Sequence, residues 1–377
     1  MLLPPLLILA LCAFGASLWF FYPAIRQWSA KAFSNQTRPQ EPPQPSPYAS
    51  HPVQFKSGEL EFAGTFTVPA GQAPFPAVVL VHGSGAHDRD ETIFDHKPFW
   101  LLADYLSRRG VAVLRYDKRG CGSSGGTMKG ATTEDFSRDA RAALEYLKAR
   151  QEVDCARLGL LGHSEGGIIV SCVAAASTDV RFIVLLAGAA LPGEEILLKQ
   201  IEAMGKQAAA AATQKALELA RGTYAILRSN SDDEKALSEI KQLRERLATP
   251  EYMLSGRERE VAMAQVEAGL PLLTSPWFRH FLVFDPRTAL SQVKCPVLAL
   301  NGEKDCQVSC AENLAAIKAA TASGGNEQVT IVALPDLNHL FQHCDTGLPS
   351  EYASIEETIA PDVLNLISDW VLALPAG

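Results

Sequence analysis

Short, uninterrupted apolar runs that alternate with helix-like segments limit the fold of this chain more than any other feature. The runs lie within residues 76–85, 111–126, 157–164, 181–189, 295–305 and 328–339. Runs of this length that are rich in β-branched residues are typical of strands buried on both faces of a parallel sheet. Helix-like segments follow most of them, so the rhythm predicts an α/β fold with a mostly parallel central sheet flanked by helices. Residues 56–69 instead alternate apolar and polar side chains, which predicts an antiparallel hairpin at a sheet edge.

A long interruption breaks this rhythm between residues 191 and 274, where no buried strand is predicted. Residues 206–227 and 232–248 are rich in strong helix formers and carry periodic apolar residues. We therefore expect a helical cap at about 191–274, inserted into a catalytic domain of residues 53–377. The cap is expected to act as a lid, and apolar stretches such as residues 276–278 favour a hydrophobic substrate.

The N-terminal segment differs from the rest of the chain. Residues 1–24 carry no charged side chain and are long enough to cross a bilayer as a helix, which predicts a membrane anchor or signal segment. The aromatic run at residues 19–22 and the absence of an early basic residue favour an uncleaved anchor. A cleavable signal peptide is the alternative, since residues 13–15 could serve as a cleavage site.

Residues 25–52 are proline-rich and polar, and are expected to form a linker between this segment and the catalytic domain. Arg26, Lys31 and Arg38 favour a cytoplasmic catalytic domain by the positive-inside rule. The signal-like start favours export instead, so the side of the membrane stays open.

Charge and cysteine content exclude several classes of function. Lys and Arg number 34 against 42 Asp and Glu, a net charge of −8, and no basic cluster stands out, which argues against nucleic-acid binding. The eight cysteines form no C-x-x-C pair, so we expect no metal site, and no disulfide framework can be read from their spacing. No organic cofactor is expected either, and the sequence does not indicate an oligomeric state.

A serine stands where the third apolar run stops. Residues 162–166 read Gly-His-Ser-Glu-Gly and fit the G-x-S-x-G pattern of a strained turn between a strand and a helix. Flanking glycines suit that turn because Cβ atoms there would clash, and ligands of open α/β sheets bind at the carboxyl ends of strands. The context predicts that Ser164 is a nucleophile.

A serine nucleophile needs a base held in the right tautomer by an acid, and after this turn the usual chain order is acid and then histidine. Asp305 follows the fifth run and His339 follows the sixth, so both are expected beside Ser164. Asp305 could instead cap the following helix, with Glu303 as the substitute acid. His343 is the substitute base.

Other acidic and histidine side chains nearby are interpreted as structural. Asp336 is too close in sequence to His339 to orient it, and His280 is expected to pack or line the pocket. His163 is expected to point away from the reaction.

The tetrahedral intermediate of such a reaction needs an oxyanion hole of two preorganised N–H donors. One is expected from Glu165, the residue after the nucleophile. The other is expected from the glycine-rich loop at residues 82–85, with the Ser84 N–H as donor. A glycine-rich turn without a catalytic role is the alternative for this loop.

Five motifs together resemble the α/β-hydrolase superfamily, above all its serine-aminopeptidase-like and carboxylesterase-type members. They read HGSGAHDRDE, YDKRGCGSSGG, GHSEGG, LNGEKDCQV and LNHLFQ. The resemblance covers residues 53–377 and implies a catalytic triad of Ser164, Asp305 and His339, with Ser84 and Glu165 in the oxyanion hole.

The same resemblance implies supporting residues beside the site. Residues 116–120 are expected to form a structural turn in which Asp117 and Arg119 hold loops. Residues 88–90 are expected to pin the oxyanion loop.

These features predict a membrane-tethered serine hydrolase that cleaves small, hydrophobic carboxylic esters through an acyl-enzyme on Ser164. A peptidase or thioesterase could use the same triad, and a peptidase would need Glu165 or a cap carboxylate to bind the substrate amine. A non-catalytic, membrane-anchored binding module on the same scaffold is a further alternative, against which the complete triad argues.

Overall fold

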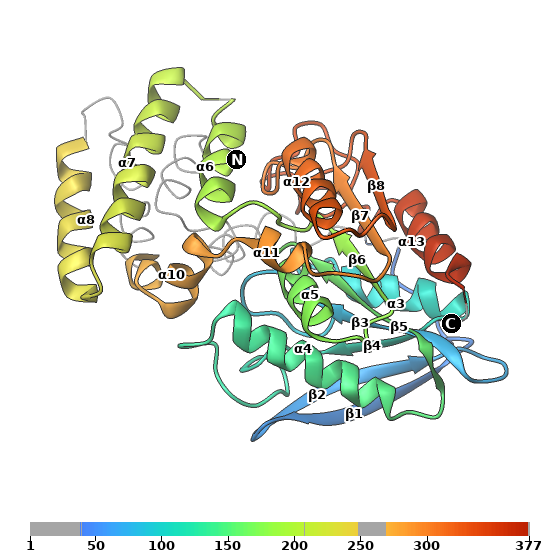
Figure 1. Ribbon diagram of the computed structural model, residues 1–377. Coiled ribbons are helices and arrows are strands. Elements are labelled where there is room, and N and C mark those ends of the chain that lie inside the picture. The colour runs from blue at the N-terminus through green and yellow to red at the C-terminus, as the bar shows by residue number, and fades with distance from the viewer. Residues whose placement is uncertain (1–37, 39, 207, 248–268, 376–377) are drawn as a thin grey trace. The chain divides into compact units, whose positions relative to one another are not determined.

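The computed structural model describes residues 38, 40–206, 208–247 and 269–375 (Figure 1). The predicted anchor at residues 1–24 lies outside the described residues. Within the described ranges, no helix is long and apolar enough to cross a membrane. The chain divides into two compact units, a sheet unit and a helical unit.

The sheet unit contains residues 35–191, 285–347 and 351–377. Its eight strands lie in the order β1-β2-β4-β3-β5-β6-β7-β8. The strands are β1 Ala49–Ser57, β2 Leu60–Val68, β3 Phe75–Val81, β4 Ala112–Tyr116, β5 Val153–His163, β6 Phe182–Leu186, β7 Val297–Gly302 and β8 Val329–Leu334. β1 pairs with β2 and β2 with β4 in antiparallel fashion, and all other pairs are parallel. The predicted edge hairpin and mostly parallel sheet are therefore confirmed.

One strand differs from the prediction. β8 was expected to be buried on both faces like the other runs, but it forms the sheet edge beyond β7 and its side chains are half-buried or exposed. An edge strand has a neighbour on one side only, and nothing in the run of apolar residues records that difference.

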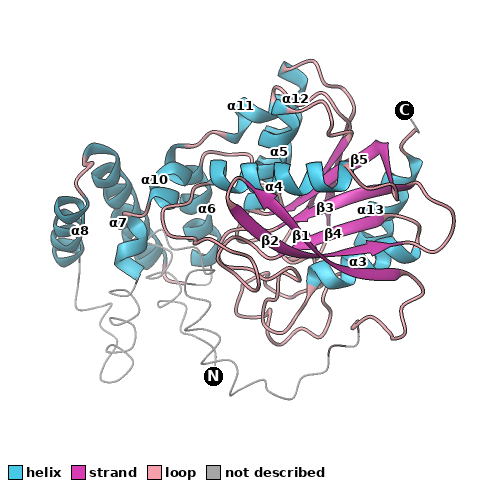
Figure 2. Cartoon of the chain, turned by 90° about the horizontal axis from the view of Figure 1, so that it is seen from below, coloured by secondary structure: helices cyan, strands magenta, loops and turns pink. Residues whose placement is uncertain are grey.

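Helices cover both faces of the sheet (Figure 2). They are α3 Pro98–Arg108, α4 Thr133–Lys148, α5 Glu165–Ala176, α11 Pro286–Leu290, α12 Cys310–Ser323 and α13 Pro361–Ala373. α3 and α13 pack together on one face, and α4, α5, α11 and α12 form the layer on the other.

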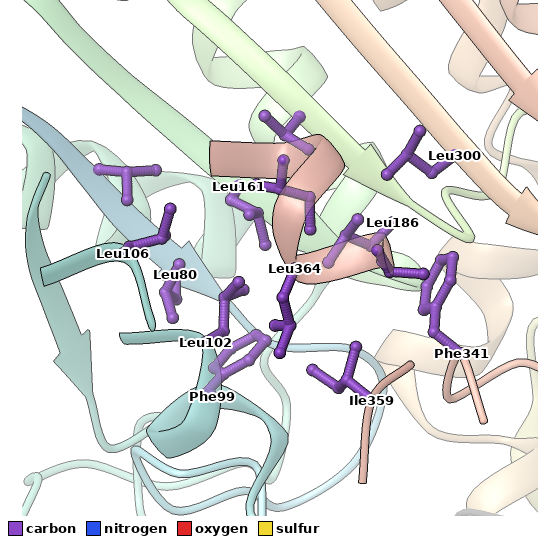
Figure 3. Close-up of a cluster of buried hydrophobic side chains, with 14 of the residues drawn as sticks. Leu80, Phe99, Leu102, Leu106, Leu161, Leu186, Leu300, Phe341, Ile359 and Leu364 are labelled. Atoms are coloured by element: carbon purple, nitrogen blue, oxygen red, sulfur yellow. The ribbon is translucent and has the colours of Figure 1, made fainter. Parts of the chain in front are cut away.

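A large apolar cluster fills the space between the sheet and the α3–α13 layer (Figure 3). Alternate residues of each central strand point into it, as the two-residue repeat of a strand requires. Leu80, Leu161, Leu186 and Leu300 come from four neighbouring strands and meet helix side chains such as Leu364. This cluster fixes the strand ends that carry the site.

The helical unit includes residues 192–284. Its helices are α6 Gly193–Gly205, α7 Ala210–Ser229, α8 Asp233–Leu247 and α10 Pro276–Val283. Arg279 of α10 donates to the carbonyl oxygens of Leu227 and Asn230 and pairs with Asp233, so one side chain joins three helices. Trp277 and Phe281 stack with their ring centroids 5.2 Å apart.

The chain before β1 lies on the sheet unit. β1 itself begins at Ala49, inside the predicted linker of residues 25–52. Arg38 donates to three backbone carbonyl oxygens, those of Phe94, Ala353 and Ile355. Gln40 donates to Ile359 O at 2.7 Å. The buried Tyr48 hydroxyl donates to Asp104 Oδ1 at 2.9 Å.

Candidate active site

The turn at Ser164 has the strained geometry that its motif predicts. Ser164 has φ 55° and ψ −119°, a region that residues with a side chain rarely adopt. A Cβ atom on Gly162 would lie 2.1 Å from Gly166 O, and one on Gly166 would lie 2.2 Å from Val81 O. The glycines are therefore needed so that β3, β5 and α5 can approach closely enough to form the turn.

His339 and Asp305 lie together at the same edge of the sheet. His339 Nδ1 is 2.7 Å from Asp305 Oδ2, and both side chains are completely buried. The second carboxylate oxygen, Asp305 Oδ1, accepts hydrogen bonds from the backbone N–H groups of Gln307 at 2.7 Å and Val308 at 2.9 Å. Asp305 thus orients the histidine and also caps the turn after β7. It does not cap the helix that follows, because the N-cap of α12 is Ser309.

The other imidazole nitrogen of His339 is the one that can accept a proton. His339 Nε2 is buried, and no residue in the described part of the chain hydrogen-bonds to it. With the Nδ1 proton directed to Asp305, Nε2 is left as a base. The His339 ring centroid lies 4.9 Å from that of His163, the neighbour of Ser164 in sequence.

The substitute residues lie elsewhere. Glu303 is exposed. His343 is exposed and its Nδ1 is 2.9 Å from Glu357 Oε2. Asp336 pairs with Lys304 at 2.8 Å. None of these three side chains takes part in the hydrogen bond between Asp305 and His339.

The glycine-rich loop after β3 contacts the nucleophile. A Cβ atom on Gly83 would lie 3.2 Å from Ser164 Cβ, so the Gly83 backbone lies directly against Ser164. The Gly83 N–H donates to Glu91 Oε1 at 2.8 Å and is already engaged. The Ser84 N–H donates to none of the described residues, while Ser84 O is 2.7 Å from His87 Nε2. Of the loop's N–H groups at Gly83 and Ser84, only the second is available to a substrate oxygen.

A buried ion pair lies behind this loop, and no motif in the sequence indicates it. Glu91 Oε2 is 3.2 Å from His163 Nδ1, and His163 Nε2 is 3.1 Å from the carbonyl oxygen of His339. Burial would raise the pKa of Glu91, but the charge of His163 holds it at about 2. Burial would lower the pKa of His163, but Glu91 raises it overall. Glu91 and His163 therefore connect the oxyanion loop, the nucleophile turn and the histidine loop.

The Glu165 side chain is unsuited to the peptidase role considered for it. It is buried, and Thr133 Oγ1 donates to Glu165 Oε1 at 2.7 Å. Lys118 Nζ lies 4.0 Å from Glu165 Oε2. A carboxylate with these neighbours faces the protein interior, so of the two candidates for binding the amine of a peptide substrate, Glu165 or a cap carboxylate, these contacts disfavour Glu165. Its backbone N–H, at the first residue of α5, remains in position for the oxyanion hole.

Charged residues around the turn at 116–120 hold loops. Arg89 forms a bidentate pair with Asp117, with a shortest distance of 2.6 Å, and Arg119 Nε binds Asp139 Oδ2 at 2.7 Å. Paired guanidinium–carboxylate contacts of this kind fix both partners, because two parallel bonds set the orientation as well as the distance.

Within the described ranges, no group of three or more His, Cys, Asp or Glu side chains is arranged to hold a metal ion. The seven cysteines in those ranges have free thiols.

Comparison with known proteins gives the family. A model of the alpha/beta hydrolase family matches residues 78–347. The chain belongs to this family. As a member of the alpha/beta hydrolase family it has the fold that the five motifs imply, and the strand ends described above are the part of that fold where the triad residues are expected.

Individual relatives agree with this assignment. Over 310 residues the chain is 30% identical to Esterase EstD of Thermotoga maritima, a match that covers 82% of this chain and 65% of EstD, just under two thirds of that protein. The solved structure of DcsB in complex with its substrate analogue has a TM-score of 0.51 at 18% identity, covering 87% of this chain and 100% of that one. The alpha/beta hydrolase GrgF from Penicillium sp. sh18 has a TM-score of 0.51 at 15% identity, covering 86% and 98%. At these identities the two structures bear on the fold alone.

Proposed function

We propose that this protein is a serine hydrolase that cleaves carboxylic esters through an acyl-enzyme on Ser164. The observation that carries the proposal is the buried Asp305–His339 pair, whose free Nε2 lies at the strand ends beside the strained turn at Ser164. A buried histidine with one nitrogen bound to a carboxylate and the other unoccupied is arranged to take a proton from a hydroxyl group.

We propose a role for each group. The Ser164 hydroxyl attacks the ester carbonyl carbon while His339 Nε2 takes its proton. The oxyanion that forms accepts hydrogen bonds from the N–H groups of Ser84 and Glu165. His339 then returns the proton to the departing alcohol, and a water molecule, activated by the same imidazole, hydrolyses the acyl-enzyme.

Two observations favour esters over the other substrates of such a triad. The relative EstD is named as an esterase and matches most of this chain. The Glu165 carboxylate, a candidate for holding the amine of a peptide substrate, is instead buried against Thr133 and Lys118. We propose small, hydrophobic esters as substrates.

Labelling with a fluorophosphonate probe tests the nucleophile. The native protein should be labelled and Ser164→Ala should not. Ser171→Ala is the matched control, because this buried serine lies in α5, the helix that follows Ser164, and its hydroxyl donates to Gly167 O at 2.7 Å. Persistent labelling of the Ser164→Ala variant would refute the assignment, and an unlabelled native protein would support a non-catalytic binding module.

Comparing substrates tests the reaction class. Short p-nitrophenyl esters should be turned over at least ten times faster than aminoacyl-arylamides or acyl thioesters at equal concentration. A preference for the arylamides would assign a peptidase instead, and a preference for the thioesters a thioesterase.

We also propose that residues 1–24 attach the enzyme to a membrane, on the basis of their length and lack of charge. The full chain should sediment with membranes after a high-salt wash, and a chain without residues 1–24 should not. A mature protein whose mass lacks these residues would identify a cleaved signal peptide, and protease protection would give the side of the membrane.

A further inference from the structure

Lys118 is a buried cation with no role in the triad. It is only 4% exposed, and its ammonium group lies 4.1 Å from the centroid of the Phe136 ring. Its nitrogen donates to the carbonyl oxygen of Gly83 at 2.8 Å and lies 4.0 Å from Glu165 Oε2. Burial lowers the pKa of Lys118, and the Glu165 carboxylate opposes that effect by favouring the charged form.

The acceptor of this bond is part of the oxyanion hole. Gly83 C=O and Ser84 N–H belong to one peptide group, and that peptide is trans. In a trans peptide the oxygen and the hydrogen point in opposite directions. Lys118 therefore approaches the peptide on its oxygen side, and the Ser84 N–H points away from the cation.

Binding a cation to the oxygen of an amide changes the opposite end of the group. The oxygen gains negative charge, the nitrogen loses it, and the N–H becomes a stronger donor, as in any chain of hydrogen bonds whose members polarise one another. The effect is largest where water is excluded and the donor is charged. Lys118 is only 4% exposed, and the nearby Glu165 carboxylate favours its charged form.

Two bonds also fix the orientation of this part of the loop. Glu91 accepts from the N–H of Gly83, and Lys118 donates to the C=O of the same residue. The peptide plane that carries the Ser84 N–H is thus held before a substrate arrives, which is the condition under which a donor stabilises developing charge most effectively.

We propose that Lys118 is a positioning residue that orients and polarises the Gly83–Ser84 peptide, so that the Ser84 N–H binds the oxyanion of the transition state more strongly. The proposal rests on the proposed function, because it concerns the same oxyanion hole. Loss of a whole oxyanion donor typically costs about 10²–10³ in rate, so loss of its polarisation should cost less, about 10- to 100-fold in kcat.

The experiment compares Lys118→Met with the native protein, with kcat normalised to the fraction of sites that a fluorophosphonate can titrate. For a p-nitrophenyl ester, kcat should fall about 10- to 100-fold while KM changes less than about twofold, because the ester carbonyl needs the donor far less than the oxyanion does. The inhibition constant of a trifluoromethyl ketone, whose adduct with serine carries an oxyanion, should rise by the same factor as kcat falls. An unchanged inhibition constant would overturn the proposal.

If Lys118 served only to neutralise the Glu165 carboxylate, the activities of the variants would differ from those that the proposal predicts. If Lys118→Met lowers kcat only because it leaves that carboxylate without its cation, the double variant Lys118→Met/Glu165→Gln should recover the activity. Polarisation of the peptide predicts that the double variant stays as impaired as Lys118→Met. Recovery to within about threefold of the Glu165→Gln single variant would overturn the proposal.

Two further variants keep the test decisive. Lys118→Gln removes the charge with a smaller change in side-chain polarity and replaces Lys118→Met if that variant does not fold. Arg119→Met is the matched control, since its guanidinium is the neighbouring cation and binds Asp139 instead of Gly83. It should lower the midpoint of thermal unfolding without changing the affinity for the ketone.

Failure of this inference is distinguishable from failure of the proposed function. If Ser164→Ala abolishes labelling but Lys118→Met leaves the ketone affinity unchanged, the serine hydrolase stands and the role of Lys118 does not. If the native protein neither reacts with the probe nor hydrolyses esters, the proposed function itself is wrong.

Discussion

Replacing Asp305 by asparagine should abolish most activity while leaving the fold intact, because the structure dictates how the new amide is oriented. In the native protein Oδ1 accepts from two backbone N–H groups, those of Gln307 and Val308, and Oδ2 faces His339 Nδ1. An asparagine can satisfy only one of these sides with its oxygen and must present its NH₂ group to the other.

The free energies of the two amide orientations decide whether the asparagine oxygen faces the backbone N–H groups or His339. Turning the NH₂ group toward the backbone would set it against two N–H donors and leave both without an acceptor, at about 1–3 kcal/mol for each buried donor. Even about 2 kcal/mol is a preference of roughly 30-fold, since every 1.4 kcal/mol is a factor of ten. The oxygen therefore stays with the backbone, and the NH₂ group faces His339.

An NH₂ group opposite Nδ1 forces that nitrogen to accept a hydrogen bond, which moves the imidazole proton to Nε2. A protonated Nε2 cannot take the proton of Ser164, and loss of the correct tautomer in triads of this kind lowers kcat by about 10⁴. Because both backbone bonds survive, the thermal unfolding midpoint should change by only a few degrees.

The assay is the hydrolysis of p-nitrophenyl butyrate, measured as kcat together with the unfolding midpoint. Glu303→Gln is the matched control, since this exposed acid lies two residues away and should keep nearly full activity. More than a tenth of native kcat in Asp305→Asn, or a larger loss in Glu303→Gln, would refute this account of the acid.

Other substitutions test the base, the turn and the buried ion pair. His339→Ala should lower kcat by at least about 10³, while His343→Ala should keep it, and the reverse order in steady-state assays would show that the wrong histidine was chosen. Gly166→Ala should lower the free energy of unfolding in urea by about 3 kcal/mol, since its Cβ would lie 2.2 Å from a backbone oxygen, and a change below 1 kcal/mol would contradict that geometry. Glu91→Gln should lower the free energy of unfolding by about 3 kcal/mol near pH 6. The difference in stability between the native protein and this variant should shrink as the pH falls from 4.5 toward 2, where Glu91 takes up its proton. It should also shrink as the pH rises through the raised pKa of His163. A difference in unfolding midpoint that does not depend on pH would exclude the ion pair.

The sheet and the candidate triad could be predicted because each has a local signature. Buried parallel strands read as unbroken apolar runs, and the turn at Ser164 needs glycines in a fixed spacing. Asp305 and His339 are candidates because of their positions after such runs, although they are 34 positions apart in the sequence. The order of the strands along the chain was enough to select both residues as candidates.

The supporting contacts could not be predicted, because they join side chains by distances in space that no spacing in sequence records. Glu91 and His163 are 72 positions apart, yet their side chains lie 3.2 Å from each other. Lys118 was placed in a structural turn, but nothing in that motif indicates that its ammonium group reaches Gly83. The edge position of β8 was missed for a similar reason, since an apolar run does not say how many neighbours its strand has.

The contacts of Arg38, Gln40 and Tyr48 determine where the catalytic protein can be shortened. A protein trimmed to start at Val53 would lose the first four residues of β1 and would leave the buried Asp104 without its phenol partner. It would also free six backbone groups near residues 94 and 353–359. One that starts at residue 36 keeps all of these bonds. A shortened protein should therefore keep Arg38 and the residues after it, since each of these contacts begins there.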